Sequence, residues 1–303
     1  MTDTKTLLVI DGSHLAYKAF FAVQHFKAKS LAASNLSELQ IMQRVTEETG
    51  RTLVGMVSKI LNAYKPTHAL IAFDDNRASD TFRAKLLPSY KAHREPKQLH
   101  HDSFVIFKKL MGSLGVNTWT VPEGYEADDL IGSVVSQFAP EFDKVYLHSG
   151  DKDFWQLVSN QVTVLTPQGR KSGRELHITP SVVIAEMGVR PDQVIAYKAL
   201  AGDSSDGYRG VNKIGDKTAR SLLNKYDSLD SIIERSPEIK GILGKSLTEG
   251  QDDARKCETL ARIVTDLELG FNSEHMVINP NPAVLKRQLA GLRKMCQANI
   301  RKL

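Results

Sequence analysis

The sequence predicts an α/β fold with a mostly parallel central sheet, followed by a helical region. In the first part of the chain, short apolar runs alternate with longer segments of helical spacing, a pattern typical of strands joined by crossover helices. From about residue 180 onward, apolar residues recur at helical spacing, and we interpret no run there as a strand. We therefore expect an α/β core over residues 1–180 and a helical region over residues 181–303, packed together because no linker-like stretch separates them.

The individual elements follow from the same patterns. The expected strands are the buried apolar runs at residues 6–10, 68–73, 117–121, 144–148 and 162–165. The expected helices have apolar residues three and four apart, over residues 53–64, 102–114 and 127–138.

Composition excludes several classes of protein. Hydrophobic residues make up 41% of the 303 residues and charged residues 25%, which is typical of a soluble globular protein. No apolar run approaches the ~18 residues that a membrane helix needs. The N-terminus carries an acid early, unlike a signal peptide, so we expect a cytoplasmic protein. Cys257 and Cys296 form no CxxC pattern, so neither a disulfide framework nor a zinc site is expected.

Carboxylates end three of the expected strands, at Asp11, Asp74 and Asp151. Because the carboxyl ends of parallel strands meet at one edge of a sheet, these side chains should lie close together. Further acids follow in short motifs, at Asp153, at Glu126, Asp128 and Asp129 in GYEADDL, and at Asp203 and Asp206 in AGDSSDG. Any one of them alone could be a helix cap or a turn former. The whole set is harder to explain in that way.

Converging carboxylates would repel one another and would have raised pKa values unless a cation neutralised them. Oxygen-rich sites suit Mg²⁺ or Mn²⁺ better than zinc. Two such ions about 3.5–4 Å apart form a recurring site for phosphodiester hydrolysis. The acids therefore predict metal-dependent cleavage of a phosphodiester, and the net charge of +5 is compatible with a polyanionic partner.

In order and spacing, the acidic motifs resemble those of the 5′-nuclease (flap endonuclease) family. This family includes the 5′-3′ exonuclease domain of bacterial DNA polymerase I and free-standing bacteriophage 5′ exonucleases. The resemblance runs from about residue 6 to about residue 235 and is carried by Asp11-Gly12, Phe73-Asp74, GYEADD, DKDFWQL and RPDQVIAYKALAGD. It implies a PIN-like core and a structure-specific 5′→3′ exonuclease and 5′-flap endonuclease that leaves 5′-phosphate and 3′-hydroxyl ends on DNA. It also implies a bacterial or phage-encoded protein.

The resemblance also implies roles for the acids. Asp74, Glu126 and Asp128 would hold one metal ion, and Asp151, Asp153 and Asp206 would hold the second. Asp129 would lie between the two ions. Asp11 and Asp203 would act mainly through water. The metal would be a pair of Mg²⁺ ions, with Mn²⁺ as a substitute.

A basic segment over residues 77–109 resembles the helical arch through which this family threads a single-stranded 5′ end. Its bases are Arg77, Arg83, Lys85, Lys91, Arg94, Lys97, Lys108 and Lys109. Lys91 and Arg94 resemble contacts to the scissile phosphate, and we include Arg83 with them as candidate catalytic residues. Tyr90 could stack on a terminal base. A solvated charged helix face is the alternative for the whole segment.

Residues 195–226 resemble the helix–hairpin–helix motif of the family. Backbone N–H groups of such a hairpin hold a duplex phosphate without reading sequence. The candidate DNA-binding residues are Gly210, Val211, Lys213, Ile214, Gly215, Lys217 and Thr218. The resemblance further implies a K⁺ ion on the hairpin carbonyls. Gly207, Arg209 and Lys213 depart from the family pattern, and Lys213 would strain the turn if its position requires a positive φ.

Two other segments are open to more than one interpretation. Residues 24–52 are polar and poorly periodic before Glu38, so we interpret them as a mobile surface segment, with a DNA-contacting insertion as the alternative. The tail from Ala283 is an amphipathic helix with a basic face. We expect it to pack on the protein, with a duplex contact as the alternative.

Three functions remain in competition on the sequence. The first is the DNA 5′ nuclease, acting on 5′ ends, flaps or branches as a monomer without a membrane partner. The second is an RNA-directed nuclease, either a PIN-type ribonuclease or an enzyme that removes RNA primers from RNA–DNA hybrids. The third is a non-catalytic binder of branched DNA, which would need the basic surfaces but no metal.

Overall fold

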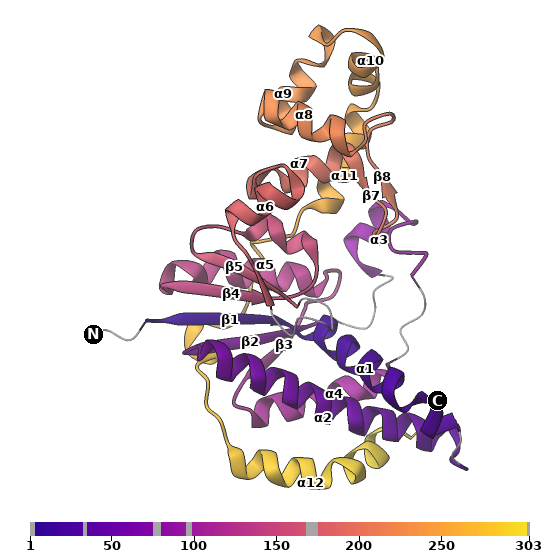
Figure 1. Cartoon of the computed structure of the whole chain (residues 1–303), viewed down its shortest axis with the longest axis vertical. Helices are drawn as coiled ribbons and strands as arrows, with labels where there is room; N and C mark the ends of the chain where they lie inside the picture. Colours follow the sequence, from indigo (N-terminus) through magenta and orange to yellow (C-terminus); the bar gives the residue numbers. More distant parts are fainter. Residues whose placement is uncertain (1–3, 33–34, 75–79, 95–98, 168–174, 302–303) are drawn as a thin grey trace.

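The computed structural model of the chain describes residues 4–32, 35–74, 80–94, 99–167 and 175–301. Its centre is a six-stranded sheet in the order β3-β2-β1-β4-β5-β6 (Figure 1). The parallel strands are β1 (Thr6–Asp11), β2 (His68–Phe73), β3 (Asn117–Thr120), β4 (Lys144–His148) and β5 (Val162–Pro167). The predicted α/β class with a mostly parallel sheet is confirmed, but β6 (Glu175–Ile178), antiparallel to β5, was not predicted.

The central strands are covered on both faces, which explains why β1 and β2 are apolar and buried along almost their whole length. Leu7 and Val9 of β1 contribute to one core cluster, whereas Leu8 and Ile10 contribute to the other. The first face is covered by α5 (Ala127–Phe138). The second is covered by α1 (Gly12–Ala32), α2 (Glu38–Tyr64), α4 (His101–Ser113) and α12 (Pro282–Asn299).

The expectation of a mobile surface segment at residues 24–52 is wrong for most of its described residues, because α1 and α2 occupy them. Ser37 begins α2 with a capping box that also uses Gln40. Within α2, small residues take part in the packing, including the buried Thr46 and Gly50. A Cβ on Gly50 would lie 3.0 Å from a methyl carbon of Leu110 on α4, so the helices approach closely there.

Residues 180–261, which follow β6, form a helical region at one end of the molecule (Figure 1). It contains α6 (Pro180–Met187), α7 (Val194–Ala201), α8 (Asp216–Tyr226), α9 (Leu229–Glu234), α10 (Gly241–Glu249) and α11 (Gln251–Ala261). A hairpin of β7 (Gly202–Asp203) and β8 (Tyr208–Arg209) interrupts it, contrary to the expectation of no strand after residue 180. These strands have two residues each and are too short to leave a pattern in the sequence.

The chain then returns to the core. Val277 forms a β-bridge with His68 at the start of β2, and α12 packs against α2 and α4. Leu292, Cys296 and Ile300 are buried in this contact, as expected for an amphipathic helix packed on the protein. The short helices are α3 (Phe82–Leu86) and the 3₁₀ turns η2 (Ala139–Glu141), η3 (Lys152–Leu157), η4 (Pro191–Gln193), η5 (Ser236–Glu238) and η6 (Ser273–Met276). No helix in the described part of the chain is sufficiently long and apolar to span a membrane.

Candidate active site

Three carboxylates meet at the carboxyl edge of the sheet because β2, β1 and β4 are neighbours. Asp11 ends β1, Asp74 directly follows β2, and Asp151 follows β4 after a short turn. Asp11 is buried and accepts hydrogen bonds from the backbone N–H of His14 and the hydroxyl of Ser149, both at 2.9 Å. The strand order thus places these three predicted residues at one edge.

Burial raises the pKa of Asp11 to about 7, although its hydrogen bonds from His14 and Ser149 act in the opposite direction. A raised folded-state pKa means that the contribution of Asp11 to stability is greatest at low pH and is lost as the pH rises through about 7. We expect the metal-free chain to lose up to about 4 kcal/mol of unfolding free energy from this group between pH 4 and pH 8. Asp11→Asn should flatten that part of the dependence in urea denaturation with EDTA. If the unfolding free energies of the variant and the wild type change with pH in parallel, Asp11 does not contribute this pH dependence.

The N-terminus of α5 adds further carboxylates to the same edge. Glu126 is its N-cap, and the backbone N–H of Ala127 donates to Asp74 at 2.9 Å, which joins the helix to β2. Burial raises the pKa of Asp128, and the charges of Lys91, Asp151 and Asp11 also act on it. Asp128 is therefore grouped with the strand-end acids.

Asp129 occupies a different place from the one expected between two metal ions. Its side chain is fully buried and forms a two-point ion pair with Arg83, at 2.8 and 2.7 Å. Its oxygens also accept the backbone N–H groups of Glu126 and Val264. Both carboxylate oxygens of Asp129 are already bonded within the protein. Asp129 therefore holds Arg83 and the backbone of Glu126 in place and does not join the carboxylate cluster.

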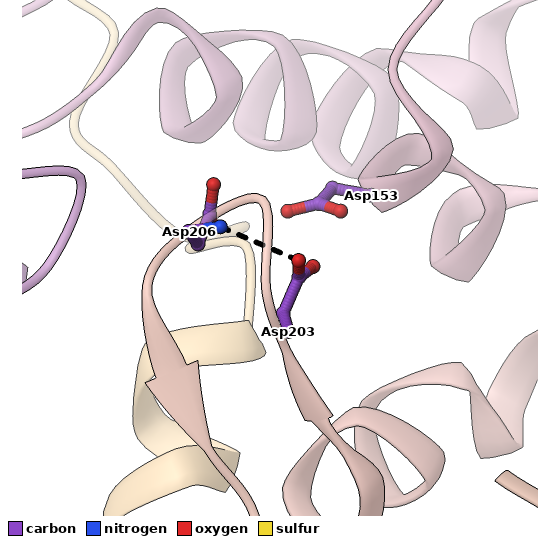
Figure 2. Close-up of side chains that lie close together, drawn as sticks. All are labelled: Asp153, Asp203 and Asp206. Carbon is purple, nitrogen blue, oxygen red and sulfur yellow. Dashed lines mark hydrogen bonds between the residues drawn. The ribbon is translucent and has the colours of Figure 1, made fainter. Parts of the chain in front are cut away.

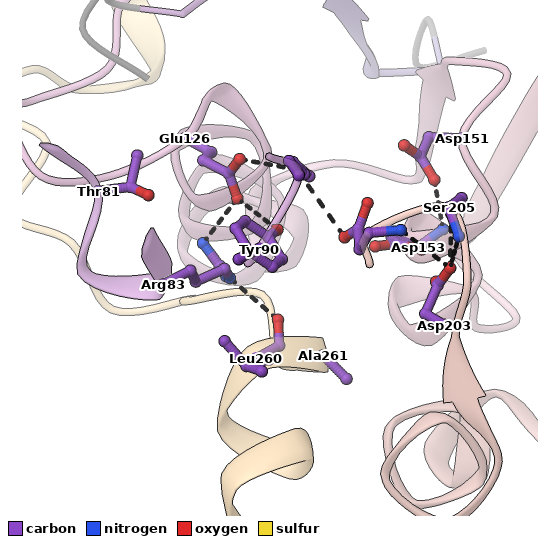
Figure 3. A network of polar contacts seen from close by, with 12 residues as sticks. Thr81, Arg83, Tyr90, Glu126, Asp151, Asp153, Asp203, Ser205, Leu260 and Ala261 are labelled. Atoms are coloured by element: carbon purple, nitrogen blue, oxygen red, sulfur yellow. Dashed lines mark hydrogen bonds and ion pairs between the residues drawn. The ribbon is translucent and has the colours of Figure 1, made fainter. Parts of the chain in front are cut away.

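Arg83, a candidate catalytic residue from the sequence, is also buried, with 2% of its surface exposed. Besides Asp129 it reaches Glu126 at 3.2 Å and donates to the backbone carbonyls of Leu260 and Arg262 at the end of α11. Figure 3 shows Arg83, Tyr90 and Glu126 gathered beside Leu260. Arg83 thus links α3, α5 and α11, and in this position it cannot contact a substrate.

A second group of acids lies beside the first. Ligand atoms of Asp153, Asp203 and Asp206 all lie within 4.8 Å of one another (Figure 2). Asp153 comes from η3, Asp203 from β7 and Asp206 from the following turn. Burial acts to raise the pKa of Asp203, but Lys198 and Ser205 together lower it to about 2. The helical region therefore supplies two carboxylates to a site that begins at the sheet.

Lys91 connects the two groups, and Arg94 pairs with the second. The Lys91 ammonium lies 2.7 Å from Glu126 and 3.9 Å from Asp206, and Arg94 lies 2.6 Å from Asp206. Although burial disfavours its charged form, Glu126 and Asp206 raise the pKa of Lys91. Lys91 has a positive φ of 53°, and its N–H donates to the backbone carbonyl of Asp206 at 2.8 Å. The strained backbone of Lys91 is thus tied to Asp206, and the Arg94 N–H donates to the Lys91 carbonyl, so both cationic residues are held at the site.

Tyr90 was expected to stack on a base, but it is 7% exposed and belongs to a core cluster. Its hydroxyl donates to Glu126 at 2.9 Å. Aromatic character alone could not show that the ring is buried. Tyr90 therefore positions Glu126, and its ring is not available to a nucleotide in this structure.

The predicted arch at residues 77–109 lies partly outside the described residues, which here are 80–94 and 99–109. They comprise α3, a turn through Arg94, and the start of α4, which packs against α2 and α12. Lys108 and Lys109 belong to that core-covering helix. Arg77 and Lys97 lie outside the described residues.

The predicted hairpin lies between β8 and α8. Val211 and Ile214 are buried, whereas Lys213 and Lys217 are exposed. A Cβ on Gly210 would approach the Leu200 carbonyl oxygen to 2.1 Å, so only glycine fits there. Gly215 caps α8, and Lys217 and Thr218 follow in its first turn. A cavity of about 580 Å³ opens beside this loop, lined in part by Tyr197, Gly210 and Lys213.

Lys213 has a φ of 65°, so its position does require the left-handed conformation. We expect Lys213→Gly to raise the free energy of unfolding by up to about 1 kcal/mol, because glycine adopts this conformation without steric cost. The measurement is chemical denaturation. Lys217→Gly is the matched control, since the same change inside α8 should destabilise by up to about 1 kcal/mol. Equal effects at both positions would contradict this account.

The two groups of carboxylates suit divalent cations. Their donors are all oxygens, and the set lacks thiolates and imidazoles, which matches hard cations such as Mg²⁺ and Mn²⁺. Cationic side chains already neutralise part of the charge, as the ion pairs of Glu126, Asp153, Asp203 and Asp206 show. The residues present therefore fit a site for metal ions.

Comparison with known proteins identifies the family. Residues 6–188 match the model of the 5′-3′ exonuclease N-terminal resolvase-like domain, and residues 189–298 match that of the 5′-3′ exonuclease C-terminal SAM fold. The chain therefore belongs to the 5′-3′ exonuclease family and is a nuclease.

Curated relatives resemble the chain in sequence, and solved structures resemble it in fold. DNA polymerase I of Bacillus subtilis is 33% identical over 290 residues, covering 91% of this chain and 31% of the polymerase. The chain spans less than a third of the length of the curated relatives that it matches. A flap endonuclease of bacteriophage T5, in complex with DNA and metal ions, has a TM-score of 0.64 and 19% identity, covering 98% of this chain and 100% of its own. The catalytic core of Rad2 with DNA substrate has a TM-score of 0.60 and 13% identity, covering 98% and 93%.

Sequence reasoning missed several residues that shape the site. Lys198, on α7, forms ion pairs with Asp153 and Asp203, and Ser149 and Ser205 donate to Asp11 and Asp203. Ser149 and Ser205 stand within the acidic motifs themselves, which was a usable signal. Lys198 lies five positions before Asp203, within RPDQVIAYKALAGD, but nothing in that motif indicates which acids its ammonium contacts.

Proposed function

We propose that this chain is a structure-specific 5′→3′ exonuclease and 5′-flap endonuclease. It hydrolyses DNA phosphodiesters with the help of two divalent ions and leaves 5′-phosphate and 3′-hydroxyl ends. The observation that carries the proposal is the meeting of carboxylates from β1, β2, α5, η3 and β7 beside Lys91 and Arg94.

Six carboxylates would hold the metal ions directly in this proposal. Asp74, Glu126 and Asp128 would hold one ion, and Asp151, Asp153 and Asp206 the other, with Asp11 and Asp203 acting through water. When bound, such ions lower the pKa of a water molecule and stabilise charge on the reacting phosphate. Asp129 and Arg83 would be positioning residues that hold Glu126. The ions would be Mg²⁺, with Mn²⁺ as a substitute.

Lys91 and Arg94 would bind the phosphate at the cleaved bond. Both are cations next to the carboxylates, and Arg94 remains about half exposed, so they can exchange an acid for a phosphate oxygen once metal neutralises the acids. The charge of these residues would stabilise the transition state as negative charge moves on the phosphate.

The hairpin would bind the duplex part of the substrate. Lys213, Lys217 and the N-terminus of α8 offer positive charge and N–H groups to a backbone phosphate. We extend the proposal to a K⁺ ion on the hairpin carbonyls, where the family resemblance places one.

The proposed DNA substrate is supported by the T5 flap endonuclease and Rad2 structures, both of which contain DNA.

The finer statements about partners are also proposals. The substrate would be DNA with 5′ ends, flaps or branches, and RNA–DNA hybrids would be cut as well. The chain would act as a monomer in the cytoplasm.

A cleavage assay tests the proposal. The substrates are duplexes labelled on a 5′ DNA flap, a 5′ RNA flap or a 3′ flap, each with Mg²⁺, Mn²⁺ or EDTA. We expect Mg²⁺-dependent cuts near the 5′-flap junction that leave 5′-phosphates, and no cuts in EDTA. Tight binding without cleavage in either metal would instead indicate a DNA-binding protein. A strong preference for the RNA flap would indicate an RNA-directed nuclease.

A further inference from the structure

Lys198 is a buried cation at the centre of the second group of acids. It is 6% exposed, and its ammonium forms ion pairs with Asp153 and with Asp203, the latter at 2.6 Å. It is carried by α7, whereas its partners come from η3 and β7. One ammonium thus holds together two carboxylates from separate parts of the chain.

The Lys198 ammonium lies against two of the three clustered carboxylates, those of Asp153 and Asp203. In the proposed function Asp153 would hold the second ion directly, and Mg²⁺ takes its oxygen ligands at roughly 2.0–2.1 Å. An ion on Asp153 would therefore lie close to the ammonium that pairs with the same carboxylate. Asp153, Asp203 and Asp206 are close enough to share one cation. Two positive charges so close together would repel strongly, so the ammonium and a metal ion cannot both occupy the same place.

We propose that Lys198 is a positioning residue that acts as an internal substitute for the second metal ion, and that metal binds there by displacing its ammonium. This inference rests on the proposed function. In the metal-free chain, Lys198 keeps Asp153 and Asp203 assembled and limits their repulsion. The same contact weakens metal binding, because each incoming ion must first break an ion pair.

Lys198→Met tests the proposal, because methionine keeps a linear side chain and removes the charge. The probe is Mn²⁺ binding to the full chain without DNA, followed by the electron paramagnetic resonance signal of free Mn²⁺. We expect the weaker class of Mn²⁺ sites to bind about tenfold more tightly in the variant, since no ion pair has to be broken. Unchanged or weaker binding would overturn the proposal.

Two further variants control for charge. Lys198→Arg keeps a cation at the position and should bind Mn²⁺ about as the wild type does. Lys152→Met removes the same charge from an exposed residue between Asp151 and Asp153, where the ammonium lies over the Trp155 ring. If Lys152→Met tightens Mn²⁺ binding as much as Lys198→Met does, the effect is a general electrostatic one and the displacement model is wrong.

Thermal unfolding gives a second measurement that does not depend on activity. In EDTA, Lys198→Met should melt below the wild type, because two buried carboxylates lose their counterion. Saturating Mn²⁺ should remove most of that difference, including any failure of the metal-free variant to fold. A deficit that persists in Mn²⁺ would show that Lys198 only supports the fold.

The outcomes separate this inference from the nuclease assignment. If the wild type binds no Mn²⁺, the proposed function fails. If the wild type binds Mn²⁺ and cleaves flaps while Lys198→Met shows no gain in affinity, only the displacement model fails.

Discussion

Asp128→Asn should lower the rate constant of flap cleavage at saturating Mg²⁺ by about 10³-fold or more. Asp128 lies among Glu126, Asp151 and Asp11, and Asn has the same shape without the charge that a metal ion requires. The fold should survive, because burial already raises the pKa of Asp128 and makes its charge unfavourable. We therefore also expect the metal-free variant to melt at a higher temperature than the wild type at pH 7.

Single-turnover cleavage of a labelled flap and thermal unfolding in EDTA measure the two effects. Asp102→Asn is the matched control, because Asp102 also lies in the first turn of a helix, α4, away from the carboxylates. The control should cleave at the wild-type rate. Cleavage by Asp128→Asn within tenfold of the wild type would show that Asp128 holds no essential metal ion.

Arg83→Met should destabilise the chain by about 3–5 kcal/mol, the largest loss of stability that we expect. The substitution leaves the Asp129 carboxylate charged and fully buried, and it removes donors from the Leu260 and Arg262 carbonyls. The double variant Arg83→Met, Asp129→Asn should recover much of the loss, because it no longer buries an unpaired charge. Urea denaturation measures each variant.

An exposed ion pair provides the comparison. Arg220 pairs with Asp216 on α8 with both side chains exposed, so Arg220→Met should cost less than about 1 kcal/mol. If Arg83→Met is as mild as Arg220→Met, the buried pair is not a structural link between α3, α5 and α11.

The acidic edge could be predicted from the sequence because it depends on short-range patterns. Asp11 and Asp74 end or follow apolar runs, and parallel strands necessarily bring such ends together. Lys213 was recognisable for a related reason, since a residue in a tight turn is constrained by its immediate neighbours. The positive φ at that position bears out the condition under which strain was expected.

Side-chain partners were less predictable because they depend on distant segments. Asp129 stands in the same motif as Asp128, yet Arg83 and the N–H of Val264 hold it away from the cluster. Tyr90 has the composition of a stacking residue, but its contact with Glu126 and its burial depend on tertiary packing. Likewise, α2 contacts α4 and α12, and no local periodicity reveals a partner from the far end of the chain.

The return of the chain after α11 connects the helical region to the sheet a second time. Its first connection passes from β6 into α6, and its second runs through the His68–Val277 bridge into α12. A body joined at one point can swing, whereas two separate crossings and the Arg83 contacts restrict its rotation. If the hairpin holds a duplex as proposed, the distance from the bound duplex to the carboxylates is constant. The position of the cut would then be measured from the duplex and would be the same for every sequence of bases.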